Sequence, residues 1–346
     1  MSETIRGEGV GSESIPRNPE THPTPPACFE VSEAQAGQRL DQVLVRLCPG
    51  HSRTRLADLI RRGQVVLVGR PAEPSQRVAR GETIEIRFDP VTEVRLEPEP
   101  LDLSIVYEDS DLIVIDKPPG LVVHPGAGHT HGTLLNGLLH RYPELVRMPR
   151  GGLVHRLDKD TSGLLIVARS ERAHETLTRE LALRKVRRTY VALIMGEPIA
   201  GRRTEAPIGR HPKNRLKQAV APGGKPADTE FRILERFPGL SWIEVHLGTG
   251  RTHQIRVHLA HIGYGLVGDP LYGPRANLRK GMNPKVREAL RSFPRQALHA
   301  IRLELHHPGT GELQSWESPL PRDLTFLLAL LRADRVARNS GRGAGA

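Results

Sequence analysis

The feature that most constrains the fold lies between residues 103 and 320, where short apolar runs alternate with turns that contain Gly or Pro. Such runs predict β-strands, and few of the intervening segments have the 3.6-residue apolar period of a helix. A doubly wound fold needs many crossover helices, so the pattern favours an α+β domain on a mostly antiparallel, mixed sheet. We predict strands at 112–115, 164–168, 190–195, 231–234, 242–247 and 298–305, and helices at 133–140, 171–184, 252–262 and 324–333.

A smaller unit is predicted at residues 28–90. Apolar residues recur with helical spacing at 40–47 and 56–60, and strand-like runs follow at 65–68 and 83–86. Arginines gather in and around the second of these helices, where guanidinium groups can grip RNA phosphates. A solvated helix face is the alternative interpretation. The side chains that we expect to bind RNA are Arg39, Arg53, Arg55, Arg61 and Arg62.

The remaining segments are predicted to flank or connect these two units. Residues 1–27 are rich in Ser, Glu, Gly, Pro and Thr and have almost no large apolar side chains, so we expect them to be disordered. Residues 91–102, rich in Glu and Pro, are predicted to be a linker. The larger domain should span 103–333, followed by a flexible basic tail at 334–346.

Composition narrows the classes of partner and compartment. The 50 Lys and Arg against 39 Asp and Glu give a formal charge of +11, which favours a polyanionic partner such as nucleic acid. Cys28 and Cys48 form no CxxC pair, which argues against a disulfide framework or a zinc ribbon and favours a reducing cytoplasm. The chain has no secretory signal pattern and no run near the ~20 apolar residues of a membrane span. We therefore expect a soluble cytoplasmic protein without a membrane partner.

The segment 151–168 places Asp158 in a polar turn between two apolar runs. A strand-turn-strand unit of this kind brings its turn to the rim of a cleft, where a carboxylate can point at a ligand. From spacing alone, an ordinary hairpin turn is the better interpretation of this Asp.

Motifs in the larger domain carry a resemblance to a known family. The run HRLDKDTSG at 155–163 resembles the hallmark motif of the pseudouridine synthase family that includes bacterial enzymes of the large ribosomal subunit. DKPPG at 116–120, RTYVAL at 188–193 and GRTHQIRVH at 250–258 resemble further motifs of that family, in the same order. In addition, the segment 37–65 resembles the RNA-binding module named after ribosomal protein S4. Together these likenesses imply an S4-like domain followed by a catalytic domain that isomerises uridine to pseudouridine.

The resemblance also implies roles for single residues. Asp158 stands at the place of the essential Asp, Tyr190 at that of an active-site Tyr, and Arg251 in the motif whose Arg pairs with the Asp. Arg156 corresponds to the residue that enters the RNA helix when the target uridine is flipped out, although a phosphate contact is its plainer interpretation. The remaining expected pocket residues are His155, Leu157 and Ile255.

The chemistry expected of these residues is cofactor-independent, because uridine isomerisation involves no redox change and no phosphate energy. An opposite charge nearby favours an ionised carboxylate in a partly dry pocket, which is the physical reason to pair Arg251 with Asp158. A phosphate contact is the second interpretation of Arg251. The carboxylate can attack the sugar or the base, or stabilise charge at the anomeric carbon, and the sequence leaves these routes open.

We expect no metal site. His253, His258 and His261 do not share one helix face, so they leave too few ligands on one side for zinc.

The resemblance implies that the partner is 23S rRNA, free or within an assembling large ribosomal subunit, and we expect a monomer. The alternative hypothesis is a non-catalytic RNA-binding factor for ribosome assembly on the same fold. The two hypotheses differ in whether Asp158 is needed for function.

Overall fold

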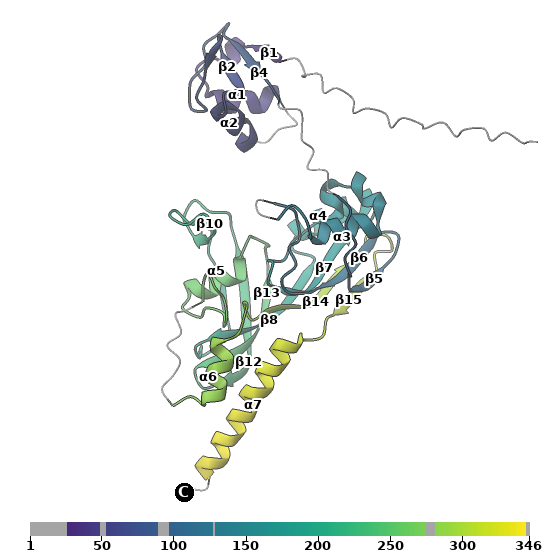
Figure 1. Ribbon diagram of the computed structural model, residues 1–346, viewed down its shortest axis with the longest axis vertical. Coiled ribbons are helices and arrows are strands. Elements are labelled where there is room, and N and C mark those ends of the chain that lie inside the picture. Colours follow the sequence, from purple (N-terminus) through teal and green to yellow (C-terminus); the bar gives the residue numbers. More distant parts are fainter. Residues whose placement is uncertain (1–25, 49–52, 89–96, 127–128, 274–280, 344–346) are drawn as a thin grey trace, which may run out of the picture. The chain divides into compact units, whose positions relative to one another are not determined.

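The chain divides into two compact units, Met1–Arg95 and Leu96–Ala346 (Figure 1). The division falls within the predicted linker at 91–102. Most of the predicted disordered segment, residues 1–25, lies outside the described residues. The computed structural model describes residues 26–48, 53–88, 97–126, 129–273 and 281–343.

The smaller unit packs two helices against a four-stranded antiparallel sheet in the described residues. Its elements are β1 (Ala27–Glu30), η1 (Glu33–Gln35), α1 (Leu40–Leu47), α2 (Arg53–Arg61), β2 (Val65–Leu67), β3 (Arg70–Pro71) and β4 (Thr83–Ile86). The strand order is β1-β4-β2-β3. Leu40, Leu44 and Leu56 on the helices are fully buried with Ile84 of the sheet, so the predicted apolar faces form the core.

The larger unit is built on a nine-stranded sheet, counted over the described residues. Its strands are β5 (Ile105–Glu108), β6 (Leu112–Lys117), β7 (Ser162–Ala168), β8 (Arg187–Met195), β9 (Arg202–Glu205), β12 (Asp228–Phe237), β13 (Leu240–Leu247), β14 (Leu298–His306) and β15 (Leu313–Glu317). The order is β5-β6-β7-β14-β8-β13-β12-β9, with β15 paired to β14. Among these described pairs only β7 and β14 run parallel. The predicted α+β fold with a mostly antiparallel, mixed sheet is confirmed.

Helices cover both faces of this sheet. They are α3 (Leu134–Arg141), α4 (Glu171–Ala182), α5 (Gln254–His261), α6 (Pro284–Arg291) and α7 (Arg322–Gly343), and a separate ribbon joins β10 (Ile208–Arg210) to β11 (Gln218–Val220). Because side chains alternate across a strand, Tyr190 and Ala192 of β8 enter the core that α3, α4 and α5 share, whereas Val191 and Leu193 pack with α6 and α7. No helix in the described part of the chain is long and apolar enough to cross a membrane.

The helix α7, yellow in Figure 1, extends beyond its predicted end. It runs to Gly343, so the described part of the predicted flexible tail, residues 334–343, is helical. Arg332 and Arg335 form ion pairs with Glu235 of β12, which tie the helix to the sheet. Linear composition does not reveal this partner, which lies about one hundred residues away in sequence.

Candidate active site

Asp158 lies in a cavity of about 440 Å³ in the larger unit. The cavity is bounded by the loop after η3 (Pro149–Gly152), by β8 and by the segment that leads into α5. The structure therefore brings together residues that are separated by about one hundred positions in sequence. All the residues predicted for this pocket line it: His155, Arg156, Leu157, Asp158, Tyr190, Arg251 and Ile255.

The backbone that carries Asp158 is a clamped loop. The first apolar run before it forms no regular strand, since Leu153 makes only an isolated bridge to Val167. The fully buried Lys117 donates from Nζ to the carbonyl oxygens of Lys159, Pro118 and Leu121 at 2.9, 2.8 and 3.0 Å.

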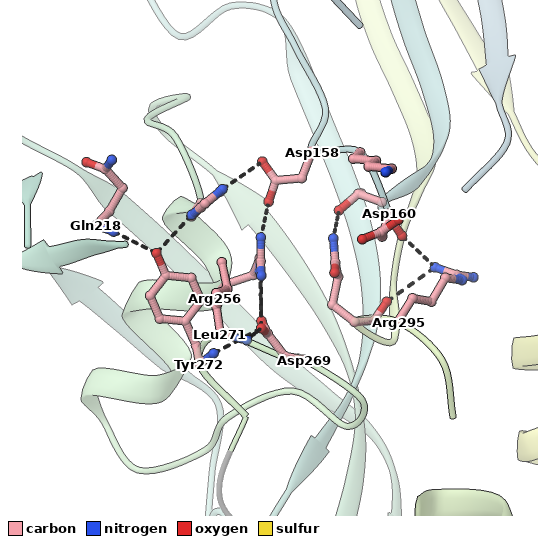
Figure 2. Close-up of polar contacts among 12 residues, drawn as sticks. Asp158, Asp160, Gln218, Arg256, Asp269, Leu271, Tyr272 and Arg295 are labelled. Carbon is pink, nitrogen blue, oxygen red and sulfur yellow. Dashed lines mark hydrogen bonds and ion pairs between the residues drawn. The ribbon is translucent and has the colours of Figure 1, made fainter. Parts of the chain in front are cut away.

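Two further side chains hold the same loop from β14's side. Nη1 of Arg295 donates to the carbonyl oxygen of Asp160 at 3.1 Å (Figure 2). Nε2 of Gln296 donates to Oγ1 of Thr161 at 3.1 Å. Lys117 belongs to β6, and Arg295 and Gln296 precede β14, so the loop before β7 is held from both neighbours of that strand. Buried side chains therefore fix the position of the loop that carries Asp158.

The ion-pair partner of Asp158 is Arg256. Its Nη1 lies 2.9 Å from Oδ2 of Asp158 (Figure 2). Arg251 is exposed, and its Nε donates to the carbonyl oxygen of Pro226 at 3.0 Å. The predicted pairing of Asp158 with Arg251 is therefore wrong. The reason is local: α5 begins at Gln254, so Arg256 lies within the helix and is buried against the loop, whereas Arg251 precedes the helix.

A second carboxylate, Asp269, holds Arg256 from the other side. Nε and Nη2 of Arg256 donate to Asp269 at 2.7 and 2.9 Å. Burial alone would lower the pKa of the guanidinium, but the hydrogen bond to Asp269 and the charges of Asp158 and Asp269 raise it overall. Burial would likewise raise the pKa of Asp269, yet the bonds from Arg256 and from two backbone N–H groups lower it. Arg256 thus presents a fixed positive charge to Asp158.

His253 approaches the other oxygen of Asp158. Its Nε2 lies 3.9 Å from Oδ1, and its Nδ1 lies 2.8 Å from Oη of Tyr272. The same Oη accepts the backbone N–H of Gln218 at 2.7 Å (Figure 2). Burial lowers the pKa of His253, which favours the neutral ring.

The remaining pocket residues provide apolar walls and neutral donors. Burial raises the pKa of the Tyr190 hydroxyl, which therefore keeps its proton, and Leu157 and Ile255 are buried apolar neighbours. Nε2 of His155 accepts the backbone N–H of Ile166 at 3.0 Å, and burial lowers the pKa of this ring to about 3. Arg156 is exposed and lines the cavity.

Sequence reasoning missed Arg256, Asp269 and Tyr272, and it weighed His253 only as a metal ligand. The run GDPLYG at 268–273, which contains Asp269 and Tyr272, was available as a signal. Its backbone N–H groups at 271 and 272 bind Oδ1 of Asp269, so this run is a turn built around a buried carboxylate.

Comparison with known proteins identifies the family. Residues 111–261 match the RNA pseudouridylate synthase family, and residues 38–84 match the S4 domain. The ribosomal large subunit pseudouridine synthase D of Pseudomonas aeruginosa is 49% identical over 89% of this chain and 96% of its own length. The enzyme of that name from Escherichia coli K12 is 47% identical over 88% of this chain and 94% of its own length. The chain belongs to the RNA pseudouridine synthase family.

Solved structures support the same assignment. Human RNA pseudouridylate synthase domain containing 1 is 27% identical, covers 68% of this chain and 97% of its own, and has a TM-score of 0.50. Human RNA pseudouridylate synthase domain containing 4 shares the fold, with a TM-score of 0.52. It is 24% identical and covers 66% of this chain and 93% of its own. The cavity around Asp158 thus belongs to a pseudouridine synthase, an isomerase of RNA that carries an S4 domain at its N-terminal side.

Proposed function

We propose that this pseudouridine synthase isomerises uridines in the RNA of the large ribosomal subunit, with Asp158 as its catalytic carboxylate. The names of its relatives support the substrate. The observation that carries the role of Asp158 is its asymmetric environment. Oδ2 is paired with a buried arginine, whereas Oδ1 makes no hydrogen bond among the described residues, and Asp158 lines the cavity.

Three neighbouring residues complete the proposed mechanism. Arg256 holds the carboxylate of Asp158 in place through their ion pair, and the Tyr190 ring provides a face for the flipped base and a protonated hydroxyl for proton transfer late in the reaction. Arg156 fills the gap that the flipped uridine leaves. Each of the three routes, attack on the sugar, attack on the base and charge stabilisation at the anomeric carbon, can use Oδ1, the oxygen of Asp158 that is not paired with Arg256. We further propose that the enzyme acts as a cytoplasmic monomer and needs no metal or other cofactor.

The substitution Asp158→Asn tests this function. Asn keeps the shape of the side chain and can still accept from Arg256, but it lacks the charge, so pseudouridine formation should fall by about 10⁴-fold or more. Pseudouridine mapping of large-subunit rRNA, from a deletion strain that expresses the variant, measures the effect. Asp160→Asn is the matched control, because that carboxylate does not line the cavity. Wild-type modification by Asp158→Asn would refute the assignment, and rescue of every deletion phenotype without modification would favour the assembly-factor alternative.

We propose that the S4 domain anchors the RNA through its exposed arginines. Arg39 and Arg53 share one carboxylate, Asp41, at 3.1 and 2.8 Å, so this group keeps an excess positive charge. Arg62 pairs with Asp58 at 2.9 Å in an exposed ion pair, which water screens. Arg61 has no acidic partner among the residues described. The side chain of Arg55 lies outside the described residues.

Salt dependence of RNA affinity tests this anchoring. Each lost phosphate contact should reduce the slope of log K against log salt by about 0.7–0.9, so Arg61→Gln combined with Arg62→Gln should reduce it by about 1.6. The slope is measured by filter binding to transcribed 23S rRNA between about 50 and 200 mM salt, the range in which affinity for nucleic acid falls steeply. Arg80→Gln, an exposed arginine outside this cluster that pairs with Glu33, is the control. An unchanged slope for the double variant would contradict the role.

A further inference from the structure

Arg188 is a buried arginine without a counter-charge. It lies two residues before Tyr190 on β8, so both side chains project from the same face of the strand and line the cavity. The residue is 7% exposed. Its Nε is buried without a hydrogen-bond partner, and no carboxylate lies within ion-pair distance in the part of the chain that the structure describes.

The other two buried arginines of the described chain are paired. Arg256 is held by Asp158 and Asp269, and Arg295 by Asp323. The contrast shows that the fold supplies carboxylates to buried guanidinium groups elsewhere in this unit, but not here.

An unpaired buried cation is unfavourable in the RNA-free protein. Burial lowers the pKa of Arg188, yet a guanidinium stays charged in proteins, so loss of the proton does not relieve the cost. Arginines dominate the charge of the cavity lining, since Arg150, Arg156, Arg188, Arg251 and Arg256 face a single carboxylate, Asp158. The cavity is therefore suited to a ligand that brings negative charge with it.

We propose that Arg188 binds a backbone phosphate of the flipped-out nucleotide and so places the base between Tyr190 and Asp158. The proposal rests on RNA as the substrate. A phosphodiester carries a full negative charge, which would supply the counter-charge that Arg188 lacks, and its oxygens match the forked donors of the guanidinium. The uracil carbonyls are neutral.

The backbone next to the guanidinium also favours this assignment. At Gly250 a Cβ would lie 2.8 Å from Nη1 of Arg188, so the glycine leaves that edge of the guanidinium uncovered. Gly250 lines the same cavity, and it lies in the segment that leads into α5 and Arg256.

The substitution Arg188→Met tests the proposal against a matched control. Met keeps the apolar stem and removes the charge, and we expect KM for transcribed 23S rRNA to rise by about 10-fold, with kcat changed much less. The salt slope of kcat/KM should fall by about 0.7–0.9. Arg187→Met is the control. It removes the charge of the preceding residue, an exposed arginine paired with Glu304 at 2.9 Å, and should leave KM and the salt slope unchanged.

Two further measurements keep the test decisive. Inorganic phosphate should raise the melting temperature of the wild type more than that of Arg188→Met, and Arg188→Lys should retain the salt slope even if Arg188→Met folds poorly. A lower kcat at saturating RNA with an unchanged salt slope would show that the guanidinium contacts the base, and would overturn the phosphate assignment. Loss of stability in both variants with unchanged KM would make Arg188 structural. None of these outcomes depends on whether Asp158 is the catalytic carboxylate.

Discussion

Arg256→Met should lose about 3–5 kcal/mol of unfolding free energy together with nearly all activity. The side chain of Asp269 is fully buried, so the substitution leaves an unpaired carboxylate inside the protein, and it also removes the counter-charge of Asp158. Urea denaturation measures the loss of stability, and pseudouridine mapping of rRNA measures the loss of activity.

Two control variants separate these effects. Arg251→Met should change stability by less than about 1 kcal/mol, because this arginine is exposed. Asp269→Asn added to Arg256→Met removes the unpaired charge and should recover part of the stability, while activity stays lost. A stable Arg256→Met variant, or a larger loss for Arg251→Met, would contradict the pairing of Arg256 with Asp158 and Asp269.

Gly163→Ala should cost about 4 kcal/mol or more, a loss that few single substitutions reach. Gly163 has a φ of 108°, and a Cβ there would lie 2.7 Å from the backbone nitrogen of Ala300 and closer still to its carbonyl oxygen. Ala300 is its partner across the parallel pairing of β7 with β14. No side-chain rotation relieves a contact with backbone, so the two strands must separate. Thermal and urea unfolding of the variant measure the cost.

Gly120→Ala separates this contact from backbone strain. Gly120 has a φ of 87°, but a Cβ there would meet nothing within 4 Å. Its substitution should cost only the strain of a left-handed residue, about 1–3 kcal/mol. Equal losses for the two glycine variants would show that close packing of β7 against β14 contributes nothing.

Much of the fold could be predicted from the sequence because local patterns specify it. The strands β6, β8, β13 and β14 each contain several buried apolar residues, since helices cover both faces of the sheet, and they were predicted within a few residues. The strand β15 was missed. It lies beside β14 alone and alternates between exposed and half-buried side chains, so its apolar signal is weak.

The candidate site shows the same limit. The sequence by itself determined the family, the position of Asp158 in a turn and the presence of Tyr190 on a strand, because each depends on residues that are neighbours along the chain. The choice of Arg256 over Arg251 depended on where α5 begins and on a contact with Asp158, 98 residues away.

Only the tertiary structure decided which charges are neutralised. Arg188 and Arg256 are both buried arginines in matched motifs. Arg256 contacts two carboxylates, whereas Arg188 contacts none in the described chain. Spacing along the sequence carries no information on such pairing, because the pairing depends on which strands and loops the folded chain brings within about 4 Å of each other. The sequence therefore predicted seven of the residues that line the cavity, and only the fold showed which of its arginines are paired with carboxylates.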